Sequence, residues 1–419
     1  MSRVRPLLRI AARNVARQGR RSALIAAAMT LGVATLAIFL ALGDGMHAQW
    51  IDAGVRLADG HVTLEAPGYR PSMDVANRLD SLAVDAVRAA LAAPDVARDV
   101  RAAAPRLAVN ALASSAASAL PVRALGVEPE AERRFSILPN RLVAGRVLQQ
   151  GDRLEALVGQ GLADRLNLQP GSRFVLAAPD TSGQVQEQLV HVAGVFKTGI
   201  REVDDGVVQL PIETVRRWLD TPGAATGIAV LLNRGRDTEA MARSLRALVP
   251  PDIAVLTWRE TSPELDAAVR VDNFGNYIFN AILLSIVALA VLEALLVSVL
   301  HRQREFGVLQ AMGLSGWETS VVVLGEGLLL AGASGLAGLA LGFGVNWILS
   351  RTGIDLSKVM GDQLSISGAI VSPIVHPEAR LSRAWQGAAV VACLGVLASL
   401  YPMWQAARID VADAVKLEQ

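Results

Sequence analysis

The chain has 419 residues, of which 52% are hydrophobic, and its mean hydropathy is +0.38. This composition favours a membrane protein, and a formal net charge of +1 argues for neither a nucleic-acid partner nor an acidic one. The single cysteine, Cys393, excludes a disulfide framework, a thiolate metal cluster and a CxxC redox pair.

The N-terminal segment 1–21 carries seven arginines and no acidic residue. Arginines recur every four residues from Arg5 to Arg17 and apolar residues occupy the other face, which predicts a basic amphipathic helix along the inner membrane interface. The uncharged run 22–43 that follows predicts a first transmembrane helix, and the positive-inside tendency places the N-terminus in the cytoplasm. A signal peptide is the alternative, but the run exceeds its usual length of about 7 to 15 residues and no clean A-x-A site follows.

Residues 44–274 form one large insertion in which strand-like and helix-like stretches alternate. The predicted strands are 61–66, 173–178, 189–196, 227–232 and 253–258. The predicted helices are 75–93, 211–219 and 237–249, with Pro211 suited to a first helical position. This mixture predicts an α+β domain outside the membrane, with two lobes.

Enzymatic motifs do not emerge from the sequence. The histidines are scattered at His47, His61, His191, His301 and His376. HExxH, GxSxG and the GxxxxGK[ST] phosphate loop are missing from the sequence, so we predict no catalytic, cofactor or metal site of its own. Glu202, Asp204 and Asp205 form an acidic group that suits a cation, but a solvated turn before a strand is the favoured interpretation.

Three further apolar segments predict transmembrane helices at 275–300, 320–349 and 385–401. The fold class is therefore a membrane protein with four transmembrane α-helices and a large α+β extracytoplasmic domain inserted between the first and second. The first span dominates the orientation, so both termini are expected in the cytoplasm. Residues 350–384 then form a short outer loop, and 402–419 form a cytoplasmic tail.

Two features of these spans are candidates for function. Glu293 and Glu326 each place a carboxylate in a span, at a cost on the order of 3 kcal/mol if it is deep in the bilayer. A coupling or substrate site is one interpretation, and a polar contact between helices near the inner boundary is the favoured one. Small residues also recur at the spacing that permits close packing or dimerisation of helices. They are Gly32 in the first span and Ser334, Gly338 and Gly342 in the third.

Residues 301–319 join the second and third spans and read HRQREFGVLQAMGLSGWET. A helix here has an apolar edge, charges at its start and a glycine placed to end it. The apolar edge consists of Phe306, Leu309 and Met312. The charges at the start are Arg302, Arg304 and Glu305, and the glycine is Gly313. The alternative is an ordinary inner loop whose apolar residues touch the membrane surface.

The stretch "HRQREFGVLQAMGLSGWETSVVVLGE" after the second span and "YPMWQAARIDVADAVK" at the end of the chain resemble the FtsX-like, or type VII, permease superfamily of ABC transporters. This group includes lipoprotein-releasing and macrolide-exporter permeases. "VAGRVLQQGDRLEALVGQGLADRLNLQPGSRFVLAA" is most similar to the lipoprotein-releasing branch. The resemblance covers essentially the whole chain.

The resemblance implies that segment 301–319 is a coupling helix that seats in a groove of a separate cytoplasmic ABC ATPase dimer, which binds ATP and Mg. It also implies a second permease copy or a paralogue, a bacterial inner-membrane location, and mechanotransmission, in which ATP binding moves the outer domains. Glu326 is expected to brace the coupling helix.

The expected function is extraction or export of a lipoprotein, lipid or other amphiphile. The alternative is a non-transporting complex that regulates periplasmic hydrolases, like the cell-division member of the superfamily. The size of the insertion and the lipoprotein-like stretches favour transport. Between two predicted strands only the short turn "PDTSGQVQEQ" is present, without a long hook, so a periplasmic carrier or adaptor stays an open partner.

Overall fold

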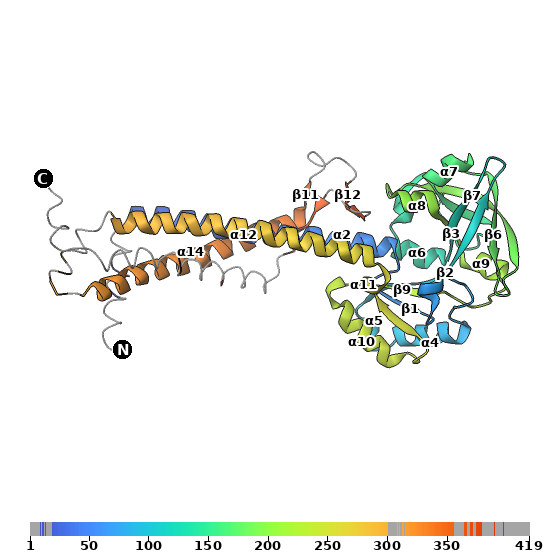
Figure 1. The fold of residues 1–419 in the computed structure, drawn as a ribbon, viewed down its shortest axis with the longest axis horizontal. Coiled ribbons are helices and arrows are strands. Elements are labelled where there is room, and N and C mark those ends of the chain that lie inside the picture. The colour runs from blue at the N-terminus through green and yellow to red at the C-terminus, as the bar shows by residue number, and fades with distance from the viewer. Residues whose placement is uncertain are drawn as a thin grey trace. The chain divides into compact units, whose positions relative to one another are not determined.

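The chain forms two compact units in the computed structural model (Figure 1). The structure describes residues 9, 11, 13, 19–300, 308, 310, 312–313, 315–355, 364–366, 369–371, 374–378, 389 and 397. One unit, here called the helical unit, comprises Met1–His47, Val271–Asp355 and Ile374–Gln419. The other, here called the sheet unit, comprises Ala48–Arg270 and Leu356–Pro373.

The sheet unit is built on a ten-stranded mixed sheet with the order β10-β1-β9-β2-β3-β8-β5-β7-β4, while β6 pairs with β2 and β7. The β3–β8 and β5–β7 pairs are parallel and the other pairs are antiparallel. The strands are β1 (Val62–Glu65), β2 (Val100–Ser114), β3 (Ala119–Val127), β4 (Leu142–Gly145), β5 (Glu155–Gly159), β6 (Arg173–Pro179), β7 (Val185–Phe196), β8 (Val207–Pro211), β9 (Gly227–Leu232) and β10 (Ala254–Thr257).

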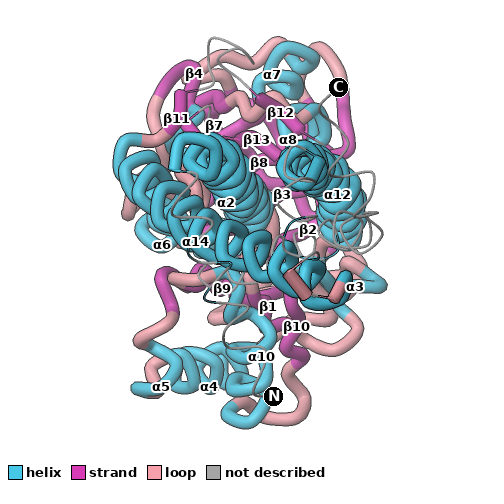
Figure 2. Tube along the Cα trace, turned by 90° about the vertical axis from the view of Figure 1, so that its left-hand side faces the viewer, coloured by secondary structure: helices cyan, strands magenta, loops and turns pink. Residues whose placement is uncertain are grey.

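Short helices cover this sheet. They are α3 (Tyr69–Ser72), α4 (Ser81–Leu91), α5 (Pro94–Ala97), α6 (Pro129–Phe135), η1 (Leu138–Arg141), α7 (Gln160–Leu166), α8 (Arg201–Gly206), α9 (Ile212–Trp218), η2 (Gly235–Asp237), α10 (Thr238–Leu248) and α11 (Trp258–Thr261). Helices α4, α5 and α10 gather beside β1 and β10 (Figure 2). An α+β domain follows the first apolar helix, as the sequence predicts.

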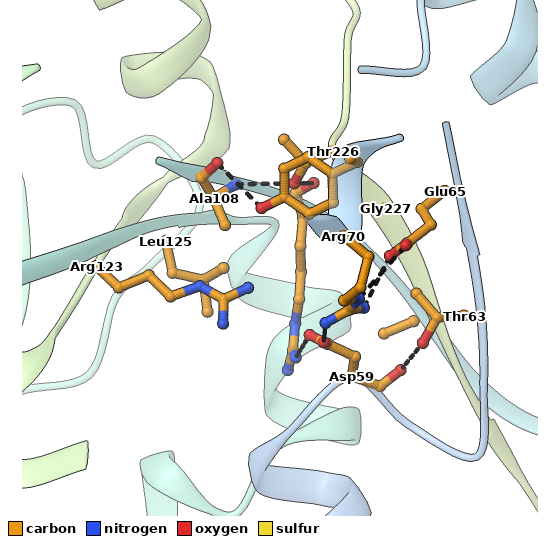
Figure 3. A pocket seen from close by; sticks show the side chains of 12 residues that line it. Asp59, Thr63, Glu65, Arg70, Ala108, Arg123, Leu125, Thr226 and Gly227 are labelled. Atoms are coloured by element: carbon orange, nitrogen blue, oxygen red, sulfur yellow. Dashed lines mark hydrogen bonds and ion pairs between the residues drawn. The ribbon is translucent and has the colours of Figure 1, made fainter. Parts of the chain in front are cut away.

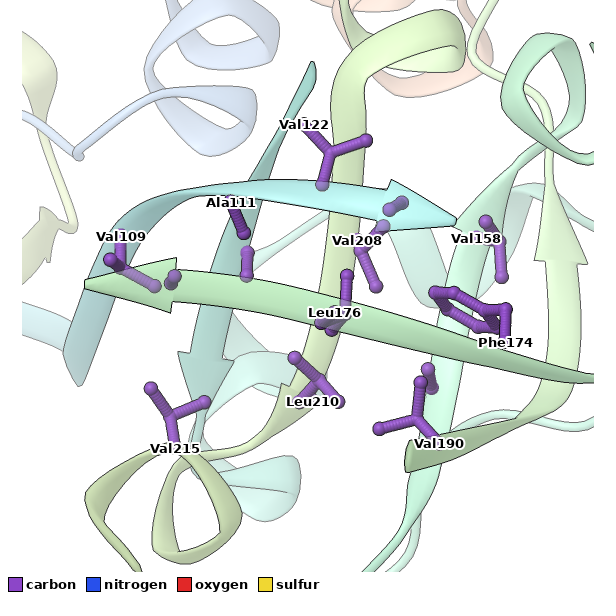
Figure 4. Packing of buried hydrophobic residues seen from close by; sticks show 14 of the residues in the cluster. Val109, Ala111, Val122, Val158, Phe174, Leu176, Val190, Val208, Leu210 and Val215 are labelled. Atoms are coloured by element: carbon purple, nitrogen blue, oxygen red, sulfur yellow. The ribbon is translucent and has the colours of Figure 1, made fainter. Parts of the chain in front are cut away.

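Two hydrophobic clusters lie on this one continuous sheet. The larger joins β2, β3, β5, β6, β7 and β8 to α7 and α9, with Phe174, Leu176 and Leu210 at its centre (Figure 4). The smaller packs β1, β9 and β10 against α4 and α10. A third cluster, which includes Trp50, Phe135 and Trp258, fixes the last turns of α2 (Gly19–Leu57) against α6 and the sheet.

The five predicted strands are confirmed as β1, β6, β7, β9 and β10. The predicted helix 75–93 is wrong at its start, because α4 begins only at Ser81, where the Asp80 carboxylate accepts a hydrogen bond of 2.8 Å from the Ala83 amide. Pro211 was predicted at the first position of a helix. It is instead the last residue of β8, and α9 begins one residue later, at Ile212.

Five strands of the ten-stranded sheet, β2, β3, β4, β5 and β8, were not predicted. Strand β2 has the sequence VRAAAPRLAVNALAS, and its alanines favour a helix by intrinsic propensity. Pairing with β3 on one edge and β9 on the other overrides that preference.

Among the described residues, the helical unit holds most of two long helices, α2 and α12 (Pro263–Leu300), and all of a third, α14 (Gly316–Thr352). Each is longer than its predicted apolar run. Among the described helices, the segments Ala26–Leu57 and Gly316–Thr352 are long and apolar enough to cross a membrane. The fourth predicted span, 385–401, lies outside the described residues except for Ala389 and Leu397.

The predicted outer loop 350–384 has secondary structure of its own in the residues that the structure describes. Two short strands, β11 (Ile354–Asp355) and β14 (Ile374–Val375), pair in antiparallel fashion. A second pair is β12 (Leu364–Ile366) with β13 (Ala369–Val371). At the other end of the chain, Ala11 of the basic segment is buried against Val322, while Arg9 and Arg13 are exposed, which fits the expected amphipathic pattern.

Candidate functional site

Helix α14 carries a stripe of small and polar residues, spaced four apart, that packs against α2 within the helical unit. Its members are Ser334, Gly338, Gly342 and Asn346, all of them buried. A Cβ atom added to Gly338 would lie 2.7 Å from the carbonyl oxygen of Thr30, and one added to Gly342 would lie 2.8 Å from Cβ of Ala37. Glycine therefore permits a closeness of the two helices that a larger residue prevents.

Two hydrogen bonds accompany this contact. Nδ2 of Asn346 donates to the carbonyl oxygen of Ala37 (3.1 Å), and Oγ1 of Thr30 donates to the carbonyl oxygen of Ser334 (3.4 Å). Polar contacts of this kind between membrane helices stabilise packing by about 0.6 kcal/mol on average. The small-residue stripe predicted in the third span thus faces another helix of the same chain.

The remaining predicted residues of the spans lie elsewhere. Gly32 is half-buried, and Thr30, Val33 and Ala37 make the contacts of α2 with Gly338 and Gly342 instead. Glu293 is exposed on α12, and Glu326 is half-buried on α14.

The segment 301–319 is described only in its second half. Its predicted residues Arg302, Arg304, Glu305, Phe306 and Leu309 lie outside the described residues. The amide of Met312 donates to the carbonyl oxygen of Val308 (3.0 Å), which is one helical turn, and Gly313 follows with a φ of +104°. Such a φ suits glycine and turns the chain out of the helix.

Helix α14 then begins with a capping box between Ser315 and Glu318. Around this turn three large apolar side chains are exposed: Val308 (46%), Met312 (69%) and Trp317 (67%). Trp317 was not among the predicted residues, because the helical spacing was followed only as far as Met312. The described part of the segment therefore offers an apolar surface on both sides of the Gly313 turn.

A buried network of charged side chains lies in the sheet unit (Figure 3). Its centre is Arg106 on β2, whose side chain is 6% exposed. Nη2 of Arg106 contacts Glu132 on α6 at 2.9 Å, and Nη1 donates to the carbonyl oxygen of Ala58 at the end of α2. The guanidinium also lies 4.5 Å from the ring centroid of Phe135. One side chain thus joins the sheet, α6 and the end of α2.

Two further acids complete the network. Arg70 contacts Asp59 at 2.9 Å and Glu65 at 2.7 Å, and Glu65 has a side-chain exposure of 2%. Nε2 of Gln209 donates to Glu132 (3.2 Å). The buried charges are thereby paired, which removes most of the cost of placing them in the interior.

The network shifts the ionisation of its acids in opposite directions. Burial of Asp59 opposes its ionisation, yet the positive charges of Arg123, Arg70 and Arg106 outweigh burial and hold the pKa of its carboxyl below the ordinary value. Burial raises the pKa of Glu65, with Arg70 opposing that rise. The negative charge of Asp59 is therefore the one that the arginines stabilise most clearly.

The acidic group Glu202, Asp204 and Asp205 is not the solvated turn predicted from sequence. It forms helix α8, and Asp204 is buried. The Asp204 carboxylate accepts hydrogen bonds from the amide of Thr198 (2.7 Å), from Oγ1 of Thr198 (2.8 Å) and from the amide of Gly199 (2.9 Å). Asp204 therefore shapes the loop before the helix. Among the described residues, no group of His, Cys, Asp and Glu has the arrangement of a metal site.

Comparison with known proteins decides the family. Residues 22–248 match the MacB-like periplasmic core domain, and residues 277–411 match the FtsX-like permease C-terminal domain. The chain belongs to the FtsX-like ABC permeases. The sheet unit is accordingly the periplasmic domain of a membrane permease, and the resemblance seen in the sequence is confirmed.

Relatives of this permease cover most of its length. The lipoprotein-releasing system transmembrane protein LolC of Xylella fastidiosa is 24% identical over 403 residues, which are 93% of this chain and 92% of that protein. LolC of Neisseria meningitidis serogroup B is 22% identical over 333 residues, which are 77% and 79% of the two chains. The macrolide export protein MacB of Hyphomonas neptunium is 35% identical over 77 residues, or 18% of this permease and 12% of that protein.

Among solved structures, the periplasmic region of MacB from Actinobacillus actinomycetemcomitans is similar to 48% of this permease, over 90% of its own chain. The sequence identity is 12% and the TM-score is 0.35.

The glycine stripe gives a prediction with an internal control. Gly338→Leu places side-chain atoms against Thr30 and Val33, so we expect it to destabilise the detergent-solubilised permease by about 1–3 kcal/mol. Gly332→Leu lies on the same helix, at an exposed position where a Cβ atom meets nothing within 4 Å, and should be nearly neutral. Thermal unfolding of both variants is the measurement. Equal melting temperatures would contradict the packing described here.

The charged network gives a second prediction. Asp59→Asn removes the charge that faces the arginines, and we expect the free energy of unfolding of the periplasmic domain to fall by about 3 kcal/mol. Asp85→Asn, at a side chain with 71% exposure, is the control and should change it by less than about 0.5 kcal/mol. Denaturant unfolding followed by tryptophan fluorescence measures both values, and a neutral Asp59→Asn would show that the network contributes little.

The loss of stability caused by Asp59→Asn should depend on pH in a defined direction. The pKa of Asp59 in the folded state lies below its ordinary value of 3.8, so its stabilising contribution is complete above about pH 4 and is lost as the pH falls through the folded-state value. The stability difference between the wild type and Asp59→Asn should therefore be constant from about pH 5 to 7 and shrink below about pH 4. A difference that grows on acidification would contradict the assigned pKa direction.

Proposed function

We propose that this permease is the membrane subunit of a type VII ABC transporter that extracts or exports a lipoprotein, lipid or other amphiphile from the bacterial inner membrane. A separate cytoplasmic ATPase dimer binds ATP and Mg, and its closure moves the periplasmic domains of two permease subunits. Both termini lie in the cytoplasm, and the second subunit is either a copy of this chain or a paralogue.

The observation that carries this proposal is the continuity of two helices. Helix α2 runs unbroken from Gly19 to Leu57 and α12 from Pro263 to Leu300, and the boundary between the two units falls inside each of them. Helices without a break are suited to transmit motion between the two sides of a membrane.

The periplasmic ends of these helices are anchored by packing. Trp50 and Val55 of α2 are buried with Val269 of α12 in one hydrophobic cluster. A Cβ atom added to Gly54 would lie 2.7 Å from the side chain of Leu265 on α12. Glycine at this position of α2 therefore permits close contact between the two helices. This anchoring supports a domain that follows its helices.

The substrate class rests on the relatives. Proteins named for lipoprotein release align with 93% of this chain at 24% identity, so the proposed cargo carries a hydrophobic anchor. The β6–β7 hairpin here has only residues 180–184 between its strands, tied by hydrogen bonds to Asp180. A periplasmic carrier, if one is used, would need another docking element.

The coupling role of segment 301–319 is tested by charge insertion. We expect Met312→Asp, alone and with Leu309→Asp, to abolish co-purification of the candidate ATPase or its permease-dependent ATP hydrolysis in nanodiscs. The reason is that a carboxylate replaces an exposed apolar side chain at the proposed interface. Mass spectrometry of the wild-type complex then identifies a retained lipoprotein or lipid.

Leu82→Asp is the matched control, because Leu82 is 77% exposed in the periplasmic domain. It should leave both complex formation and hydrolysis unchanged. An intact, fully coupled complex in the Leu309→Asp, Met312→Asp double variant would refute the coupling role. Normal coupling without any amphiphile that stimulates turnover would favour the regulatory alternative.

A further inference from the structure

Residues 374–378, here called the strap, lie across α2 within the helical unit. The amide of Glu378 donates a hydrogen bond of 2.9 Å to the carbonyl oxygen of Ala41. A Cβ atom added to Gly45 would clash with the carbonyl oxygen of His376 and would lie 3.0 Å from the carbonyl carbon of that residue. The backbone of the strap therefore rests directly on α2, at a position where the helix carries no side chain.

The strap also contacts the C-terminal end of α14. Its first two residues form β14, which pairs with β11 directly after α14. A Cβ atom added to Gly353, the residue after α14, would meet the side chain of Ile374 and would lie 3.2 Å from Nε2 of His376. Val375 of the strap is only 2% exposed. The strap is thus packed at both ends, against α14 and against α2.

These contacts extend the packing of α2 on α14. The two helices run in the same direction, since Thr30 bonds to Ser334 and Ala37 bonds to Asn346. The strap adds a further level at Ala41, one helical turn beyond Ala37 and toward the periplasmic domain. Close contacts at successive levels along two helices oppose sliding of one helix past the other, because packed interfaces do not deform continuously.

We infer that the strap is a positioning element that fixes α2 to the end of α14, so that these two helices move as one body during the ATPase cycle. This inference rests on the proposed function. Helix α14 begins directly after the proposed coupling segment, and α2 leads into the periplasmic domain. The fixed pair therefore joins the ATPase contact to that domain.

Cross-linking of the strap to α2 tests whether the contact persists through the cycle. Ala41→Cys and Glu378→Cys are combined with Cys393→Ser in the complex with the candidate ATPase, and a short thiol-to-thiol cross-linker is added. We expect the same high yield without nucleotide and with ATP and vanadate, and an unchanged rate of ATP hydrolysis after cross-linking. A low yield in either state would overturn the inference, and so would a loss of hydrolysis that reductant restores, because the strap would then have to release α2.

A substitution on α2 tests the positioning role. Gly45→Ala places a Cβ atom against the backbone of the strap, so we expect it to lower the cross-linking yield at least about five-fold. The ATPase should stay bound and hydrolyse ATP, while the ATP-driven change in distance between the periplasmic domains is lost. Gly43→Ala is the matched control, because it brings the same gain in helix propensity while its Cβ atom would lie 3.6 Å from Oδ1 of Asn276, an ordinary contact. It should behave as the wild type.

The results separate this inference from the proposed function. If ATP moves the periplasmic domains equally in the wild type and in Gly45→Ala, the strap does not position α2 and the inference is wrong. If the wild type hydrolyses ATP without any such movement, the proposed function fails. Equal cross-linking in both nucleotide states, lowered by Gly45→Ala alone, would in that case still support a fixed contact between the strap and α2.

Discussion

The buried guanidinium of Arg106 is the contact on which the periplasmic domain depends most. It reaches the end of α2 through Ala58, α6 through Glu132 and Phe135, and the sheet through its own strand. A charge at 6% exposure is tolerated only because each of its partners is in place. The entry of α2 into the domain is therefore fixed by polar contacts as well as by the apolar cluster around Trp50.

A different constraint acts in the helical unit. There α2 and α14 approach through Gly338, Gly342 and two hydrogen bonds to backbone carbonyls. This is the expected solution in a bilayer, where apolar side chains gain little by leaving lipid and close backbone contact matters more. Buried charged contacts thus stabilise the sheet unit, and close packing at glycines stabilises the helical unit. Helix α2 takes part in both.

The sequence predicted the features that depend on local pattern. Apolar runs marked the helices, and alternation marked β1, β6, β7, β9 and β10. It failed where pairing overrides propensity, as in the alanine-rich β2, and where one capping residue sets a boundary, as Asp80 does for α4. The charged network was not predicted, because its members Asp59, Arg106, Glu132 and Gln209 are far apart in the chain and meet only when α6 and the turn after α2 pack on the sheet. An arginine within an apolar strand was the one local signal for it.

In the proposed mechanism, ATP binding in the cytoplasm moves the periplasmic domains. Pulsed electron paramagnetic resonance tests this directly, with a spin label at Leu82→Cys in each permease subunit, after replacement of the single native Cys393 by serine. If the partner is a paralogue, its label is placed at the equivalent exposed position. We predict that ATP with vanadate shifts the distribution of distances between the two labels relative to the nucleotide-free complex. An unchanged distribution in a complex that hydrolyses ATP would contradict the account.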